Sequence, residues 1–169
     1  MTYTKDIFAN ELLLKLSEEP FNIVKISRWC YIKYVDHIRE MDDELYNLVS
    51  ELSTMEDDPQ FEYSREELVS IATKMLSVES VYRLIQKAFL KDWDPIGIGE
   101  WKDAQDEYDS YIPEVYQLLS TGSKDEVFMY LWWAETQHME LKGNEKNTKA
   151  FVQRLIDLTY SHFYFPKKS

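Results

Sequence analysis

The chain has 169 residues, of which 44% are hydrophobic and 15% aromatic, and its formal net charge is −12. This length suffices for one domain with a sizeable core or for two small domains. A strong negative charge disfavours nucleic acid and anionic membrane surfaces as partners and favours a basic protein. No apolar run approaches the roughly 20 residues of a membrane-spanning helix.

The numbers of cysteines, glycines and prolines indicate the cellular compartment and the fold class. The lone cysteine, Cys30, excludes an internal disulfide and suits a reducing compartment, and we expect its thiol to be buried. Asp6 and Glu11 interrupt the apolar run of residues 1–16, which argues against a signal peptide, so we expect a cytoplasmic protein. Four glycines and five prolines are few for a β-sandwich and favour long helices.

The first half of the chain is predicted to form four helices. Apolar residues recur at helical spacing within residues 3–16, 23–39, 45–52 and 65–75. Pro20 ends the first of these segments. The residues predicted to cap the next three helices are Asn22, Asp42 and Ser64, and Ser64 forms a capping box with Glu67.

The second half is predicted to hold helices at residues 78–90, 113–120, 123–141 and 148–163, with an irregular stretch at residues 91–105. Ser123 and Glu126 form a second capping box. An alternative for residues 160–165 is a strand, because four of these six residues are aromatic. We therefore predict an all-α, compact bundle of about seven or eight helices, with an N-terminal half (1–78) and a C-terminal half (79–169) packed as one unit.

Acidic residues concentrate in two segments. Residues 40–67 hold eleven acids against Arg65 alone, and residues 92–114 hold eight against Lys102 alone. The rest of the chain is net positive. Many of these acids suit solvated helix starts, which the helix dipole favours. In the second segment, however, Trp93, Trp101 and Tyr111 are interleaved with the acids, and this combination is typical of a surface that binds a basic partner.

We expect Trp93 to be buried and Asp103, Asp106, Glu107 and Asp109 to point outward. The residues predicted to contact a partner are Trp101, Asp103, Asp106, Glu107, Asp109, Tyr111, Asp57, Asp58 and Glu62.

Catalytic and metal-binding motifs are few. Glu135 and His138 form one E-x-x-H pair, but the second pair that a di-iron helical bundle requires is missing. Residues 97–99 (GIG) lack the third glycine of a dinucleotide-binding loop. We therefore expect no cofactor and no resident metal. One alternative stays open, in which the carboxylates between Asp103 and Glu114 hold a divalent cation.

Two stretches of the first half carry a family resemblance. Residues 26–31 (ISRWCY) and residues 51–68 (ELSTMEDDPQFEYSREEL) resemble immunity proteins of bacterial contact-dependent growth inhibition systems. Cys30 stands where that pattern usually has alanine, and Gln60 where it usually has glutamate. Residues 93–99, 106–111 and 115–119 resemble a module of many uncharacterised bacterial proteins, with no known activity.

The resemblance implies a cytoplasmic, non-catalytic protein that binds and neutralises a cognate toxin domain delivered by a neighbouring cell. Toxins of this kind are often nucleases, and a nuclease is basic where it holds nucleic acid, which matches the two acidic segments. The alternatives are a small helical metal-dependent enzyme that uses the carboxylates between Asp103 and Glu114, or a helical adaptor protein. Neither the toxin's chemistry nor the oligomeric state follows from the sequence.

Overall fold

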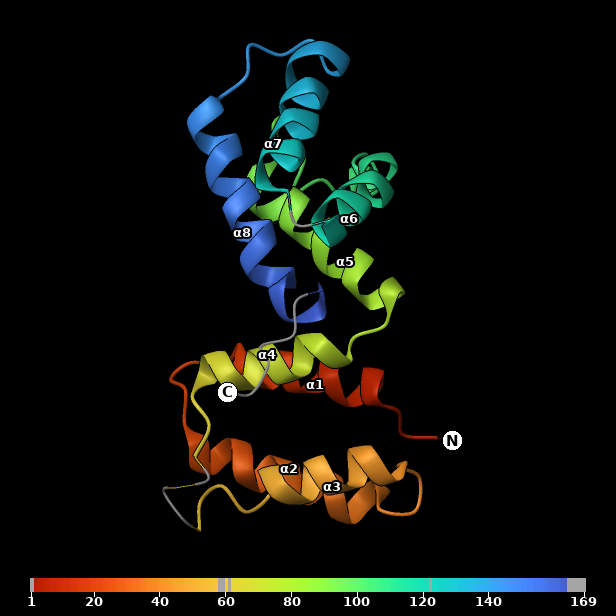
Figure 1. The fold of residues 1–169 in the computed structure, drawn as a ribbon, viewed down its shortest axis with the longest axis vertical. Helices are drawn as coiled ribbons and strands as arrows, with labels where there is room; N and C mark the ends of the chain where they lie inside the picture. The colour runs from red at the N-terminus through yellow and green to blue at the C-terminus, as the bar shows by residue number, and fades with distance from the viewer. Residues whose placement is uncertain (1, 58–59, 61, 122, 164–169) are drawn as a thin grey trace. The chain divides into compact units, whose positions relative to one another are not determined.

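The computed structural model describes residues 2–57, 60, 62–121 and 123–163. These residues form eight α-helices and no β-strand, which confirms the all-α prediction (Figure 1). The chain divides into two compact units, Met1–Ser77 and Val78–Ser169. Each unit is described by itself below.

The N-terminal unit contains two pairs of packed helices, α1 with α4 and α2 with α3 (Figure 1). The helices are α1 (Lys5–Leu16), α2 (Ile23–His37), α3 (Asp43–Leu52) and α4 (Arg65–Met75). The fully buried side chains of this unit include Phe8, Leu12, Leu45, Val49 and Leu68. All of these except Phe8 belong to the predicted apolar stripes. Cys30 on α2 is buried, as expected.

The caps predicted for this unit are present. The side-chain oxygens of Asn22 and Asp42 accept hydrogen bonds from the first turns of α2 and α3, at 3.1 and 2.8 Å. Ser64 and Glu67 complete a reciprocal capping box, with bonds of 3.2 and 2.7 Å. Capping is a short-range interaction, which explains why a few residues of sequence suffice to locate these helix starts.

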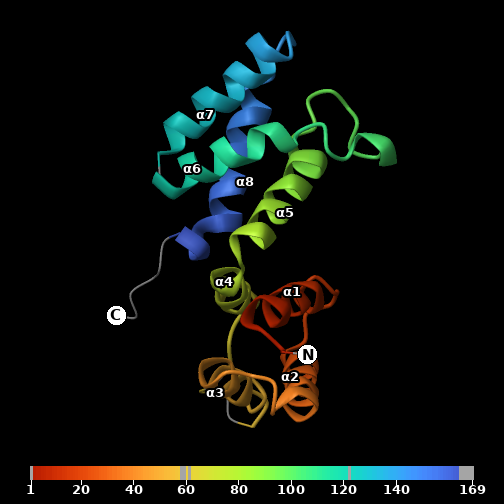
Figure 2. The same ribbon diagram turned by 90° about the vertical axis from the view of Figure 1, so that its right-hand side faces the viewer.

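The C-terminal unit contains four packed helices (Figure 2), and aromatic side chains form much of its core. The helices are α5 (Val78–Ala88), α6 (Ile112–Thr121), α7 (Lys124–Trp133) and α8 (Glu145–Phe163). Phe89, Trp93, Tyr108 and Phe151 are buried in contact with one another, and the rings of Trp93 and Phe151 stack in parallel with their centroids 5.7 Å apart. Trp93 is therefore buried, as the sequence predicts.

Two helices of this unit continue into π-helical turns that the hydrophobic pattern does not predict. Phe89–Trp93 extends α5, and Ala134–His138 extends α7 where one continuous helix to residue 141 was expected. Short 3₁₀ turns, Lys102–Ala104 and Asp109–Tyr111, occupy the stretch before α6.

The last helix also differs from its prediction. It starts at Glu145, earlier than expected, and Tyr160 to Phe163 form its final turn, so the strand alternative is wrong for these residues. Residues 164 and 165 lie outside the described part of the chain.

Candidate protein-binding surface

The segment that connects α5 to α6, residues 94–111, forms an ordered acidic loop. Its first residue, Asp94, has a left-handed backbone (φ 37°), which aspartate tolerates better than most residues. The Asp94 carboxylate accepts hydrogen bonds from the amides of Ile98 (2.8 Å) and Gly99 (2.9 Å) and from the hydroxyl of Tyr108 (2.9 Å). Burial works to raise the pKa of this carboxyl, but these hydrogen bonds outweigh burial and hold the pKa below its usual value.

Hydrogen bonds from two glutamine side chains hold the rest of the acidic loop. Gln105 donates from Nε2 to the carbonyl oxygens of Gly99 (3.1 Å) and Trp101 (2.9 Å). Gln86 on α5 donates to the carboxylate of Asp109 (2.6 Å). A side chain at Gly99 would meet the carbonyl oxygen of Leu90 at 2.3 Å, so the loop's approach to α5 requires glycine there. The backbone of the loop is thus held before any partner arrives.

The acidic loop presents one large ring and three carboxylates to solvent. Trp101 is 65% exposed, and Asp103, Asp106 and Glu107 are exposed beside it in the sequence. Within the described part of the chain, none of these three acids forms a salt bridge. Figure 2 shows the loop, in green, as a projection at one side of the C-terminal unit.

Two predicted contact residues of this segment behave differently from Trp101 and the three acids. Tyr111 is 7% exposed, and its hydroxyl lies 2.6 Å from Nδ1 of His138, so little of its ring is open to a partner in this structure, and its role as a contact residue stays a prediction. The ring faces α7, where it contacts Tyr130. Asp109 points outward as expected, but its carboxylate is already bonded to Gln86.

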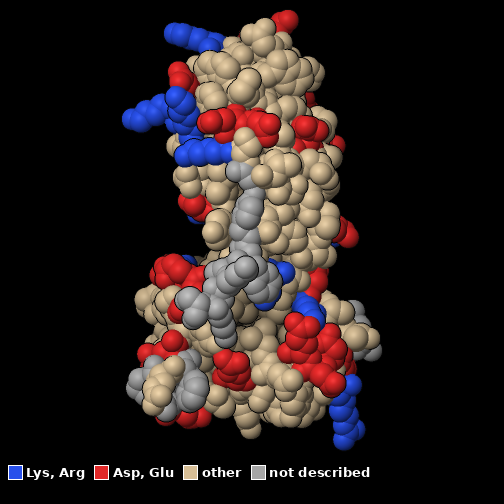
Figure 3. Space-filling model, in the orientation of Figure 1, with Lys and Arg blue, Asp and Glu red and all other residues tan. Residues whose placement is uncertain are grey.

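The other predicted contact residues belong to the N-terminal unit. Asp57 and Glu62 are exposed there, and Asp58 lies outside the described residues. Many acids of residues 40–67 have local roles. Asp43 and Glu44 occupy the first turn of α3, where the helix dipole favours them, and Lys5 forms ion pairs with Asp42 and Glu44. Acidic side chains gather in groups on the face shown in Figure 3.

The E-x-x-H pair has a structural explanation. Glu135 is buried, and its carboxylate accepts hydrogen bonds from the amide of Asn144 (3.0 Å) and the hydroxyl of Thr148 (2.5 Å) at the start of α8. The Thr148 hydroxyl in turn accepts a bond from Nε1 of Trp93 (3.2 Å). His138 contacts Tyr111 instead. Among the described residues, no group of three or more His, Cys, Asp or Glu side chains could hold a metal ion.

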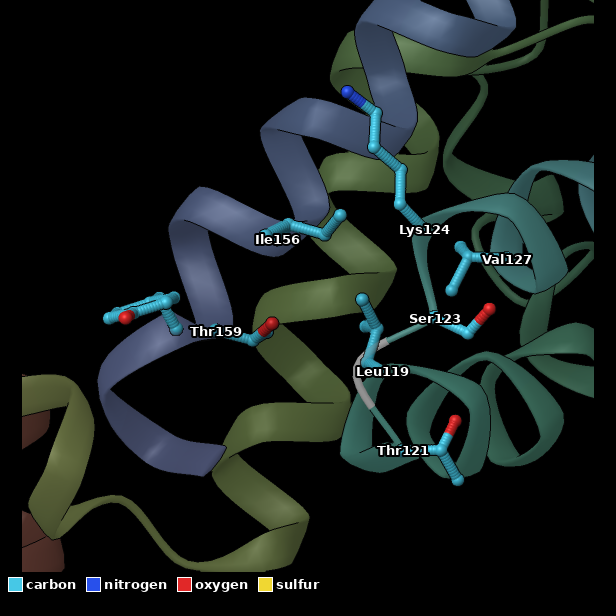
Figure 4. A pocket seen from close by; sticks show the side chains of 8 residues that line it. Leu119, Thr121, Ser123, Lys124, Val127, Ile156 and Thr159 are labelled. Atoms are coloured by element: carbon cyan, nitrogen blue, oxygen red, sulfur yellow. The ribbon is translucent and has the colours of Figure 1, made fainter. Parts of the chain in front are cut away.

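A pocket of about 360 Å³ lies in the C-terminal unit, between the end of α6, the start of α7 and α8. Leu119, Lys124, Val127 and Ile156 are among the residues that line it (Figure 4). The ammonium of Lys124 donates a hydrogen bond to the side-chain oxygen of Gln153 at 2.8 Å. The hydroxyl of Thr159 donates to the carbonyl oxygen of Leu155. The pocket therefore offers mainly apolar surface, and it contains none of the predicted contact residues.

Comparison of the chain with models of protein families, with curated proteins and with solved structures finds no match. Within the described residues, no helix is long and apolar enough to cross a membrane. Among the described residues, the acidic loop combines exposure, carboxylates without a salt bridge and a backbone held by hydrogen bonds.

Proposed function

We propose that this protein is a cytoplasmic, non-catalytic immunity protein that binds a basic toxin domain through its acidic loop. The observation that supports binding is the exposure of Trp101, Asp103, Asp106 and Glu107 on a loop whose backbone is already held by hydrogen bonds. A fixed loop loses little conformational entropy on binding, and an exposed tryptophan supplies a large apolar anchor. The toxin as partner is supported by the sequence resemblance of residues 26–31 and 51–68.

The chemistry of such a complex follows from charge. A nuclease domain is basic where it holds its nucleic-acid substrate. Carboxylates of a bound protein can pair with the same basic side chains that otherwise bind the phosphates of the substrate. Asp103, Asp106 and Glu107 have no ion-pair partner among the described residues, so no existing salt bridge has to break before they bind a lysine or arginine. In this proposal the loop covers the substrate groove of the toxin.

Charge reversal of the loop tests this proposal. The variant carries Asp103→Lys, Asp106→Lys and Glu107→Lys, and it spares Asp109 because that carboxylate bonds Gln86. Exposed charges contribute about 0–1 kcal/mol each to stability, so the variant should fold. We expect it to lose protection of cells that express the toxin domain encoded beside it. The matched control carries Asp36→Lys, Asp125→Lys and Asp157→Lys, which changes the net charge equally at exposed sites outside both acidic segments.

The result separates the proposal from its competitors. A folded triple variant that protects as well as the wild type would show that the acidic loop is not the binding surface. The next candidate would then be the exposed acids Asp57 and Glu62. The metal-dependent enzyme would be favoured if elemental analysis of the purified protein found about one divalent ion per chain. The adaptor would be favoured if the protein bound a partner other than a toxin.

A further inference from the structure

A second exposed surface, on α7, consists of aromatic rings rather than carboxylates. The ring of Trp133 stacks with those of Tyr130 and His138, with centroid distances of 5.8 and 5.4 Å and interplanar angles of 28° and 23°. Trp133 is 46% exposed, and neighbouring Met129 is 67% exposed. We call Met129, Tyr130, Trp133 and His138 the aromatic face.

The π-helical turn creates this arrangement. In Ala134–His138 the amide of Met139 bonds the carbonyl oxygen of Ala134, five residues back, so each turn holds more residues than in an α-helix. Residues five apart, such as Trp133 and His138, then lie over one another. The hydroxyl of Tyr111, 2.6 Å from Nδ1 of His138, also holds the imidazole in place. Single π-helical turns inside α-helices are frequent at functional sites.

The surroundings of the aromatic face are acidic. Lys124 is the only lysine or arginine between Asp103 and Leu141, and Lys102 and Lys142 border this stretch. Burial raises the pKa of the Tyr130 and Tyr111 hydroxyls, and the nearby carboxylates of Glu114 and Glu107 raise the two pKa values further. Glu114 and Glu107 are both exposed. Exposed rings with negative charge beside them attract a positively charged group.

We propose that the aromatic face receives an arginine side chain of the partner protein. A guanidinium is planar, stacks on aromatic rings and stays charged, and it can bond a carboxylate at the same time. Lysine presents a compact, strongly hydrated charge that stacks less well. A second copy of this chain is the less favoured occupant, because it would bring the same acids to the contact. This inference rests on the proposed function and adds to it the kind of side chain the partner supplies.

The test uses two short peptides and the indole N–H signals of ¹⁵N-labelled full-length protein. The peptides, acetyl-GRGRG-amide and acetyl-GKGKG-amide, have equal charge and differ only in the cation. We expect the arginine peptide to shift the Trp133 indole signal, assigned with Trp133→Leu. It should bind about fivefold more tightly than the lysine peptide, because the planar guanidinium stacks on the ring and the strongly hydrated ammonium stacks less well. Trp133→Leu should abolish that preference, whereas Tyr31→Leu, at an exposed ring of the N-terminal unit, should leave it unchanged.

Each other outcome overturns this inference. Equal binding of both peptides would mean attraction by charge alone. A shift at Trp101 without a shift at Trp133 would place the cation on the acidic loop, and a Trp133 shift that follows protein concentration without peptide would identify a second copy as the occupant. Protection against the toxin is measured separately. A Trp133→Leu variant that keeps full protection, beside a charge-reversed loop that loses it, would remove this inference and leave the proposed function standing.

Discussion

The hydroxyl of Tyr108 donates a 2.9 Å hydrogen bond to the carboxylate of Asp94, and this contact closes the acidic loop. Tyr108 is fully buried, and its oxygen also accepts a bond from the amide of Ile96 at 3.3 Å. One buried hydroxyl thus joins the first turn of the loop to its last. The presentation of Trp101 and the three unpaired acids depends on this pair.

We predict that Asp94→Ala loosens the loop without unfolding the protein. The change leaves the amides of Ile98 and Gly99 without their acceptor and should cost about 1–3 kcal/mol. Amide hydrogen exchange should become faster at these two residues and stay unchanged in the N-terminal unit. Unchanged exchange at both amides would contradict the role assigned to Asp94. The control is Asp92→Ala, at a neighbouring acid whose salt bridge to Arg154 has an N–O distance of 3.7 Å.

The same carboxylate predicts how the loop responds to pH. Its pKa is lower in the folded protein than in the unfolded chain, so the folded state binds fewer protons. The stabilisation is therefore complete above the unfolded value of about 3.9 and is lost as the pH falls through the lower folded value. The Ile98 and Gly99 amide signals should keep their positions down to about pH 4 and move below it. Asp94→Asn should show no such step, and a step well above pH 5 would contradict the prediction.

Thr148 links Trp93 to Glu135 through two buried hydrogen bonds, so we predict that its substitution destabilises the C-terminal unit. Thr148→Val keeps the shape of the side chain but leaves the Trp93 N–H and one Glu135 oxygen without partners. The expected loss in free energy of unfolding is about 2–4 kcal/mol, measured by urea denaturation. Thr148→Ser retains the hydroxyl and should cost clearly less. Equal losses for the two variants would mean that packing, not hydrogen bonding, matters there.

Burial raises the pKa of the Cys30 thiol to about 12. At pH 8 nearly all of the thiol is therefore protonated, and only the thiolate attacks a disulfide reagent. We expect Ellman's reagent to react with native protein much more slowly than with protein in urea. Rapid reaction of the native protein would show that α2 opens readily.

The unpaired acids predict salt-sensitive association with the partner. Screening reduces the reach of charge to about 8 Å at physiological ionic strength, so the association rate should fall as salt increases, while the dissociation rate changes less. Stopped-flow measurements over a range of salt concentrations check this for the wild type and for the Asp36, Asp125 and Asp157 control. An association rate independent of salt would indicate an apolar contact and leave the acids a role in solubility alone.

Local features of this protein follow from its sequence. The caps at Asn22, Asp42 and Ser64 and the stripe of α3 depend on residues within one or two turns, and short-range physics decides them. The burial of Trp93 and the exposure of Asp103 also agree with the sequence, because a large apolar ring avoids water and an unpaired carboxylate seeks it. The resemblance to immunity proteins stays a hypothesis.

The tertiary structure decided what depends on distant residues. Tyr111 is buried, and its hydroxyl is bonded to His138, which is 27 residues away in the sequence. A pattern of neighbouring residues does not predict such a distant partner. The carboxylate of Glu135 can be buried because the Asn144 amide and the Thr148 hydroxyl donate hydrogen bonds to it. The stack of Trp133 on His138 needs a π-helical turn, which helical periodicity at 3.6 residues does not indicate. A charged or aromatic residue shows in the sequence what it can bind, but only the folded chain shows which of its possible partners is already in place.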